Sequence, residues 1–239
     1  MHLTLTPGSD PTVHASDPST QGRNAVVDTD TQDFAARFTD SLTSAPGLEL
    51  ALLRPLLTLL AAGEPVTADQ LAAETGRTAQ EIRQALAAMP DTEYDTQGRI
   101  TGYGLTLNPT PHRYETDGRT LYTWCALDTL VFPAVLGHTA QVTSPCRAIG
   151  KPVRLTVTPD GPTIVEPAGA VVSLVACETP ASIRTSFCNE IHFFTSAETA
   201  EEWLAGHPGS RVLPVADAYA IEQPLIQQIL TGTSPSGCC

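Results

Sequence analysis

Two side chains that could do chemistry together lie three residues apart in a strongly apolar segment, residues 121–133. They are Cys125 and Asp128. If this segment is helical, the spacing places the thiol and the carboxyl group on the same face. A thiolate is a nucleophile and a ligand for soft metals, and a nearby carboxyl group can accept or donate its proton. Free cysteines are also common packing residues, so the pair alone leaves a purely structural explanation open.

A second cysteine that could complete such a site is Cys188, in the segment of residues 184–194. The chain has six cysteines, at positions 125, 146, 177, 188, 238 and 239. They are sparse for a chain of 239 residues and do not follow the spacing of a disulfide framework. No CxxC pair occurs, so a zinc-finger site is not indicated. We therefore expect reduced thiols.

Composition and charge limit the function classes. An apolar share of 41% over 239 residues supports a folded core. Thirteen basic and 26 acidic residues give a net charge of -13, which opposes binding to phosphate backbones and anionic membranes. No apolar run is long enough to span a bilayer, and the first residues lack the features of a signal peptide. The sequence thus predicts a soluble cytoplasmic protein without nucleic acid or membrane partners.

The N-terminal part divides into two regions. Residues 1–45 are rich in Pro, Ser, Thr, Asp and Gly and are predicted to form a flexible extension, within which a short helix could form at residues 33–42. Residues 46–108 read as three helices followed by a hairpin that turns at Gln97 and Gly98. This order is typical of a winged-helix-like domain.

Charge argues against DNA binding by this domain. Its third helix and hairpin carry acidic side chains that match their arginines in number. A DNA-reading winged helix needs a basic surface to neutralise phosphates. We therefore expect the domain to pack against the rest of the chain and close a site there.

The C-terminal part changes character. Residues 109–232 contain alternating apolar and polar strand patterns, one short amphipathic helix and a final helix interrupted at Pro224. Residues 233–239 are predicted to be a flexible tail that carries the pair Cys238 and Cys239. The fold class is predicted to be α+β, a winged-helix-like helical domain followed by a larger mixed domain with mainly antiparallel strands.

Four segments resemble the alkylmercury (organomercurial) lyase family, in the family's order: residues 92–107, 121–133, 165–169 and 186–194. The resemblance extends from about residue 48 to about residue 230. It implies an enzyme of mercury resistance that cleaves the carbon–mercury bond of alkyl and aryl mercury compounds by protonolysis, giving a hydrocarbon and Hg(II). It implies no cofactor, because Hg(II) is the product.

The resemblance also implies the site residues. The family's two active-site cysteines fall on Cys125 and Cys188, and its active-site aspartate falls on Asp128. Cys125 and Cys188 would hold the Hg(II) product, with Asp128 a further candidate ligand. Cys146 matches a family cysteine regarded as structural, and Asn189 stands where the family often has another cysteine.

The expected chemistry suits these residue types. Mercury is a soft metal that prefers thiolates, and a carboxyl group that takes a thiol proton can later deliver it to carbon. External thiols are needed for release, so small thiols or a mercuric reductase are the expected acceptors. The terminal pair Cys238 and Cys239 resembles the terminal pair of mercuric reductases, and would either transfer Hg(II) or bind metal without a designed role.

The residues alone leave other roles and other functions open. Trp124 and Phe187 precede the two cysteines and would be either walls for the organic group or ordinary core aromatics. His192 is interpreted as a hydrogen-bonded core histidine rather than a metal ligand, and Cys177 as a packing residue. A non-catalytic thiol trap for mercury or copper, a metal-responsive regulator and a cysteine hydrolase are the alternative functions. Asp128, which a trap does not require, favours the enzyme.

Overall fold

The structure is a computed structural model, and it describes residues 1–2, 29–45, 48–175 and 180–232. Cys177, Cys238 and Cys239 lie outside the described residues, and so does the predicted tail of residues 233–239. Within the described residues, no helix has the length and apolar character needed to cross a membrane.

Four helices form the N-terminal part: α1 (Thr29–Thr43), α2 (Leu50–Leu60), α3 (Ala68–Thr75) and α4 (Ala79–Ala87). Helices α3 and α4 both begin with a capping box, in which a threonine and the glutamine or glutamate three residues later each accept a backbone N–H. Such boxes satisfy N–H groups that have no partner inside the helix. The three helices predicted before the hairpin are confirmed as α2, α3 and α4.

Helix α1 corrects the prediction for the start of the chain. It is longer than the helix considered at residues 33–42, and its Phe34 and Phe38 are buried. The Phe38 ring packs edge-on against Phe187, with ring centroids 5.7 Å apart. Residues 29–43 are therefore folded onto the body of the protein, and the prediction of a flexible extension through residue 45 is wrong for them.

An eight-stranded antiparallel sheet joins the N-terminal and C-terminal parts. Its order is β1-β2-β3-β5-β4-β6-β7-β8. The strands are β1 (Glu93–Tyr94), β2 (Ile100–Tyr103), β3 (Leu105–Thr106), β4 (His112–Thr116), β5 (Arg119–Thr123), β6 (Ala140–Pro145), β7 (Pro152–Thr158) and β8 (Gly161–Glu166). The predicted hairpin is β1–β2, with Gly98 at φ +75° in its turn. Because β3 pairs with β5, the hairpin region continues directly into the main sheet.

A smaller sheet and several short helices complete the chain. Its order is β10-β9-β11, from Val171–Leu174 (β9), Phe193–Phe194 (β10) and Arg211–Pro214 (β11). The remaining helices are α6 (Ile183–Ser186), η1 (Cys188–Glu190), η2 (Glu198–Ala200), α7 (Glu201–Gly206), α8 (Val215–Ile221) and α9 (Gln223–Thr231). The interrupted final helix is thus the pair α8 and α9, with Pro224 in the first turn of α9. The α+β fold class is confirmed.

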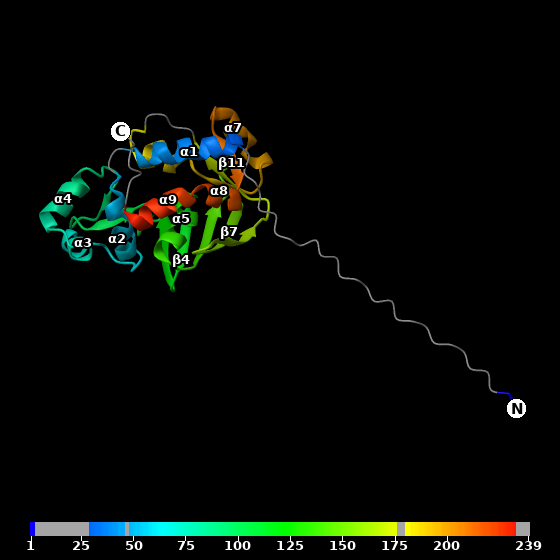
Figure 1. The fold of residues 1–239 in the computed structure, drawn as a ribbon, viewed down its shortest axis with the longest axis horizontal. Coiled ribbons are helices and arrows are strands. Elements are labelled where there is room, and N and C mark those ends of the chain that lie inside the picture. Colours follow the sequence, from blue (N-terminus) through cyan, green and yellow to red (C-terminus); the bar gives the residue numbers. More distant parts are fainter. Residues whose placement is uncertain (3–28, 46–47, 176–179, 233–239) are drawn as a thin grey trace.

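Helix α5 (Asp128–Leu136) is the central element of the core. It contacts α2 and α9 as well as strands β6, β7 and β8. Figure 1 shows α5 and α9 over the sheet, with α3 and α4 at one end of the molecule and α7 and β11 at the other. Because α5 is surrounded in this way, its first residue, Asp128, is partly buried rather than exposed.

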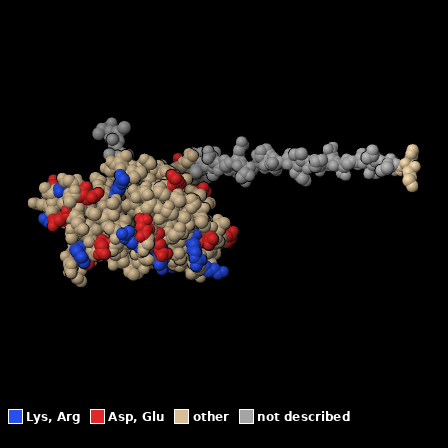
Figure 2. Space-filling model, turned by 90° about the horizontal axis from the view of Figure 1, so that it is seen from below, with Lys and Arg blue, Asp and Glu red and all other residues tan. Residues whose placement is uncertain are grey.

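Surface charge agrees with the expectation against DNA binding. Three of the four arginines of the helical domain form ion pairs with carboxylates: Arg77 with Glu49, Arg83 with Asp69 and Arg99 with Asp95. On the face shown in Figure 2, basic and acidic side chains are intermixed among uncharged ones. Paired arginines leave little free positive charge for phosphate contacts.

Candidate active site

Cys125 lies in a turn rather than in a helix. Strand β5 pairs with β3 and β4 and ends at Thr123, and α5 begins only at Asp128. The condition for a shared helix face, a helix that includes both Cys125 and Asp128, is therefore not met. The two residues are still adjacent, because the Cys125 N–H donates to Asp128 Oδ2 at 3.2 Å.

Cys188 reaches the same place from a distant part of the chain. It begins the short η1 helix, directly after Phe187, whose backbone leaves helical geometry at φ −128° and ψ −65°. Phe187 is completely buried and anchors this bend. The Ala126 N–H donates to the Ile191 carbonyl at 3.2 Å and links the two cysteine segments.

The Cys125 and Cys188 sulfur atoms and an Asp128 carboxylate oxygen all lie within 4.8 Å of one another. Among the described residues, these are the one group of three or more His, Cys, Asp or Glu side chains close enough to share a metal ion. Cys125 and Cys188 are buried, and Asp128 is partly buried. The structure thus brings together the three residues that the sequence singled out.

A small apolar cavity of about 60 Å³ adjoins these three residues. Trp124 and Phe187 both line it, together with side chains from α1, α2, α5 and α9: Phe38, Leu42, Leu53, Phe132, Leu225 and Ile229. Gly104 also lines it, at φ +72°, and a Cβ there would lie 2.7 Å from Phe132 Cζ. Only glycine fits this close approach between the sheet and α5.

Burial controls the protonation of the group. It raises the pKa of Cys125 well above the usual thiol value. The hydrogen bond with Cys125 lowers the pKa of Cys188, but burial and the carboxylates of Asp128 and Asp91 outweigh it, so that pKa is also raised. Burial raises the pKa of Asp128 to about 6, despite the opposing hydrogen bonds from Cys125. Near neutral pH both thiols are therefore protonated, and Asp128 is mostly ionised and ready to accept a proton.

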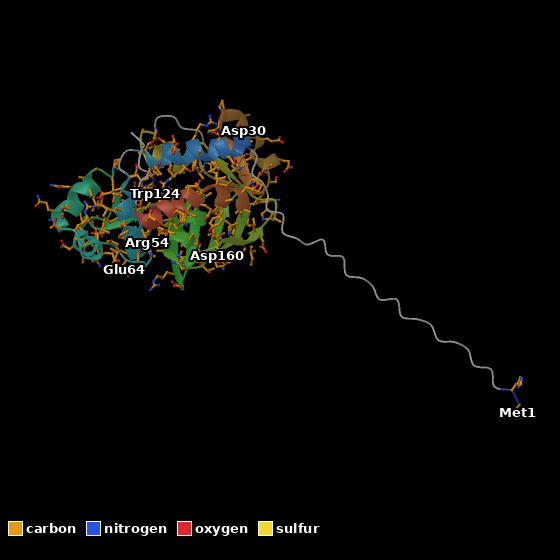
Figure 3. The ribbon with its side chains drawn as sticks, viewed as in Figure 1. Met1, Asp30, Arg54, Glu64, Trp124 and Asp160 are labelled. Atoms are coloured by element: carbon orange, nitrogen blue, oxygen red, sulfur yellow. The ribbon has the colours of Figure 1, made fainter. Side chains whose placement is uncertain are left out.

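A polar network that the sequence did not reveal holds both cysteine segments. Glu93, on β1, accepts a hydrogen bond from Trp124 Nε1 at 3.0 Å and forms an ion pair with Arg184. The Arg184 guanidinium also lies 4.7 Å from the centroid of the Trp124 ring. Figure 3 places Trp124 where the N-terminal helices meet the sheet. The hairpin thus positions the residues next to Cys125 and Cys188, a role that depends on contacts between remote segments.

Glu222 is a second buried carboxyl group that the sequence analysis missed. It lies between α8 and α9 and is completely buried. Within the described part of the chain, neither of its carboxyl oxygens has a hydrogen-bond partner. Burial, assisted by the charge of Asp128, raises the pKa of Glu222 to about 8. No local pattern in the sequence distinguishes this glutamate from an exposed one.

The pKa of Glu222 predicts a pH-dependent stability. The folded protein keeps a proton on this group up to about pH 8, while an unfolded chain releases it near the ordinary glutamate pKa of 4.5. The folded state then binds more protons, so the free energy of unfolding falls as pH rises through this window, by up to ~1.4 kcal/mol per unit.

Denaturant unfolding at pH 5.5 and 7.5 tests this prediction. Between these two pH values, the free energy of unfolding should fall by roughly 2 kcal/mol less in Glu222→Gln than in the parent. The exposed Glu64, labelled in Figure 3, provides the matched control Glu64→Gln. Equal pH dependence in the Glu222 variant and the parent would contradict the burial of an uncompensated carboxyl group.

The other residues singled out from the sequence lie outside the group of three. Cys146 Sγ accepts a weak hydrogen bond from Thr195 Oγ1 at 3.8 Å and lies 4.0 Å from Thr199 Oγ1. His192 is only partly buried, so its interpretation as a core histidine is wrong. It instead lines a second cavity with Cys146 and Cys188.

Comparisons with family models and with curated proteins all identify the same family. Residues 105–227 match the model of the alkylmercury lyase family, and residues 33–104 match the helix-turn-helix domain of alkylmercury lyase. The chain is 58% identical to an alkylmercury lyase of Streptomyces lividans over 89% of this chain and all of that protein. It is 44% identical to an alkylmercury lyase of Pseudomonas putida over 82% of this chain and 94% of that protein.

A solved structure supports the same fold. The crystal structure of the mercury-bound form of MerB2 superposes with a TM-score of 0.69, covering 82% of this chain and 98% of that chain at 24% identity. Since both parts of the chain match the family and the curated relatives are similar over nearly their whole length, this chain belongs to the alkylmercury lyases, the enzymes that cleave the carbon–mercury bond in mercury resistance.

Proposed function

We propose that Cys125, Cys188 and Asp128 carry out the cleavage by protonolysis, releasing a hydrocarbon and leaving Hg(II) between the two cysteines. The observation that carries this proposal is the convergence of two sulfur atoms and one carboxylate oxygen within 4.8 Å, next to an apolar cavity. Two thiolates are the ligands that mercury prefers, and a carboxylate beside them can move protons.

The first step is ligand exchange at mercury. The substrate enters as an organomercury–thiol complex. One of the two cysteines replaces the small thiolate on mercury, and the proton of that cysteine leaves with the small thiol. Asp128, ionised near neutral pH because its pKa is about 6, then takes the proton of the other cysteine. That second thiolate also binds mercury. The raised pKa of Cys125 makes this assistance necessary, since a buried thiol does not ionise unaided.

The second step breaks the carbon–mercury bond. Two thiolates donate electron density to mercury, so the bonding pair moves onto carbon. Asp128 returns its proton to that carbon, the hydrocarbon leaves, and Asp128 is again ionised. Both cysteine protons are accounted for, one in the small thiol and one in the hydrocarbon. Hg(II) stays bound by Cys125 and Cys188, with Asp128 near enough to serve as a further ligand.

The N-terminal helices supply a cover for this chemistry. Phe38 and Leu42 of α1 and Leu53 of α2 form part of the apolar cavity. A dry apolar wall suits a short alkyl group and keeps the charge on mercury and carbon away from water. We assign α1 and the helical domain of residues 46–108 this packing role rather than DNA binding.

Release of Hg(II) requires external thiols, and we infer small thiols or a mercuric reductase as acceptors. A reducing compartment such as the cytoplasm would supply them and keep Cys125 and Cys188 reduced. The terminal pair Cys238 and Cys239 remains a candidate for collecting the metal, a role that thiol exchange would permit.

The test is a single turnover without excess thiol. Mixing the protein with one equivalent of a methylmercury–thiol complex should release one methane per chain, measured by headspace gas chromatography. One Hg(II) per chain should remain bound after gel filtration. Mercury retained without methane would identify a thiol trap and overturn the proposed chemistry.

A further inference from the structure

A second cavity, of about 430 Å³, reaches Cys188 from another side. Cys188 and Trp124 line both this cavity and the apolar one, whereas Cys125 lines only the apolar one. The second cavity also contains four polar side chains, Arg147, His112, His192 and Asn189, beside Pro111, Pro145, Cys146 and Gly150. Mercury bound to Cys188 would therefore face two cavities, an apolar one and a second one with an arginine in its wall.

The second cavity carries a local positive charge in an acidic protein. Within the described residues, no carboxylate lines it. Burial lowers the pKa of His112 to about 3, and burial together with Arg147 lowers that of His192 to about 4, so both rings are neutral at pH 7. Arg147 is exposed, and no ion pair to it occurs in the described part of the chain. Its guanidinium is thus available to an anion.

The backbone fixes the position of this arginine relative to the site. The Arg147 N–H donates to the Phe193 carbonyl at 2.9 Å, on the strand that follows the Cys188 segment. His112 is held by Ser144, with Nδ1 and Oγ 3.0 Å apart. Asn189, directly after Cys188, is exposed and offers both a donor and an acceptor. A volume of this size suits a small molecule rather than a protein segment.

We propose that this cavity is the docking site of the small, carboxylate-bearing thiol that removes Hg(II), with Arg147 binding its carboxylate. The inference rests on the proposed function, because it requires Hg(II) held by Cys125 and Cys188. A net charge of -13 repels an anionic thiol from most of the surface, so a local cation is needed to concentrate it at the metal.

The transfer is a thiol exchange with no change of oxidation state. The docked thiol loses its proton, its sulfur forms a bond to Hg(II), and the bond from mercury to Cys188 breaks. The released Cys188 sulfur takes up that proton. A second small thiol replaces Cys125 in the same way, so two thiols enter, two cysteine thiols re-form, and Hg(II) leaves as its bis-thiolate complex. Cys188 is released first because it lines the cavity and Cys125 does not.

The experiment compares thiols that differ in charge during steady-state methane release from methylmercury. Thioglycolate is anionic, 2-mercaptoethanol is neutral and cysteamine is cationic. Arg147→Glu should raise the half-saturating concentration of thioglycolate about 10-fold and lower that of cysteamine. The half-saturating concentration of 2-mercaptoethanol should stay within about 2-fold of the parent value. Arg147→Gln should give an intermediate rise for thioglycolate. Arg154→Glu, at an exposed arginine of β7 outside the cavity, is the matched control and should change none of these values.

Single-turnover methane release separates this inference from the proposed function. Without excess thiol, Arg147→Glu should still release one methane per chain at the parent rate, since release of Hg(II) is not required. A normal single turnover with an equal shift for all three thiols, or with no shift, would overturn the docking site and leave the mechanism intact. Absence of methane from the parent protein would overturn both.

Discussion

Replacing Cys125 or Cys188 by serine is expected to reduce methane release from methylmercury by roughly 1000-fold or more, because each variant removes one of the two soft ligands that activate the carbon–mercury bond. A serine hydroxyl is close in size to a thiol, so the buried site should keep its shape. It is a hard, poorly ionised ligand that mercury binds weakly. Single-turnover rates measured by headspace gas chromatography would show the loss.

The matched control for both variants is Cys146→Ser. Cys146 is also a buried, free cysteine, but it lies outside the group formed by Cys125, Asp128 and Cys188. It should keep single-turnover cleavage within about 10-fold of the parent, provided that circular dichroism shows a folded protein. Cleavage at the parent rate by Cys125→Ser or Cys188→Ser would remove that cysteine from the mechanism.

Asp128→Asn is expected to lower the single-turnover rate by roughly 10²- to 10⁴-fold, the range typical of a lost general acid or base. The amide has nearly the shape of the carboxylate, and its oxygen can still accept the Cys125 N–H, which lies 3.2 Å from Asp128 Oδ2. It cannot take a thiol proton or return one to carbon. Methylmercury binding, measured by equilibrium dialysis, should therefore persist while methane release is lost.

The pH dependence provides a second readout for Asp128. The carboxyl group accepts a thiol proton only when ionised, and its pKa is raised to about 6. The parent rate should therefore fall as pH decreases below about 6, approaching a tenfold loss per unit. Asp95→Asn, at a carboxylate paired with Arg99 on the hairpin, is the control and should keep both the rate and the pH profile. A parent-like rate in Asp128→Asn would overturn its proton-transfer role.

Several features of this protein were determined locally and could be predicted from the sequence. Thr67 and Gln70, and Thr78 and Glu81, form capping boxes whose partners lie within four residues, so α3 and α4 begin where the pattern predicts. The break before Pro224 is equally local, since proline cannot continue the hydrogen bonding of α8. The strand and helix patterns predicted the α+β fold class, and the resemblance of four segments to one family implied the activity, without any knowledge of contacts.

Other features were decided by the tertiary structure, because they depend on contacts between remote segments. The sequence left open whether residues 121–133 are helical. Pairing of β5 with β3 and β4 makes the first of these residues a strand, Cys125 lies in a turn, and the helix begins at Asp128. Residues of α1 have a loop-like composition, and only packing of Phe34 and Phe38 against the core makes them a buried helix.

The site itself shows the same division. Residue types suggested thiol and carboxyl chemistry for Cys125 and Asp128, and the resemblance to the family implied the full set with Cys188. Their approach to within 4.8 Å, the raised pKa values of Cys125 and Asp128, and the complete burial of Glu222 came only from the fold. Distance and desolvation are properties of the whole packed chain, and no spacing along the sequence encodes them.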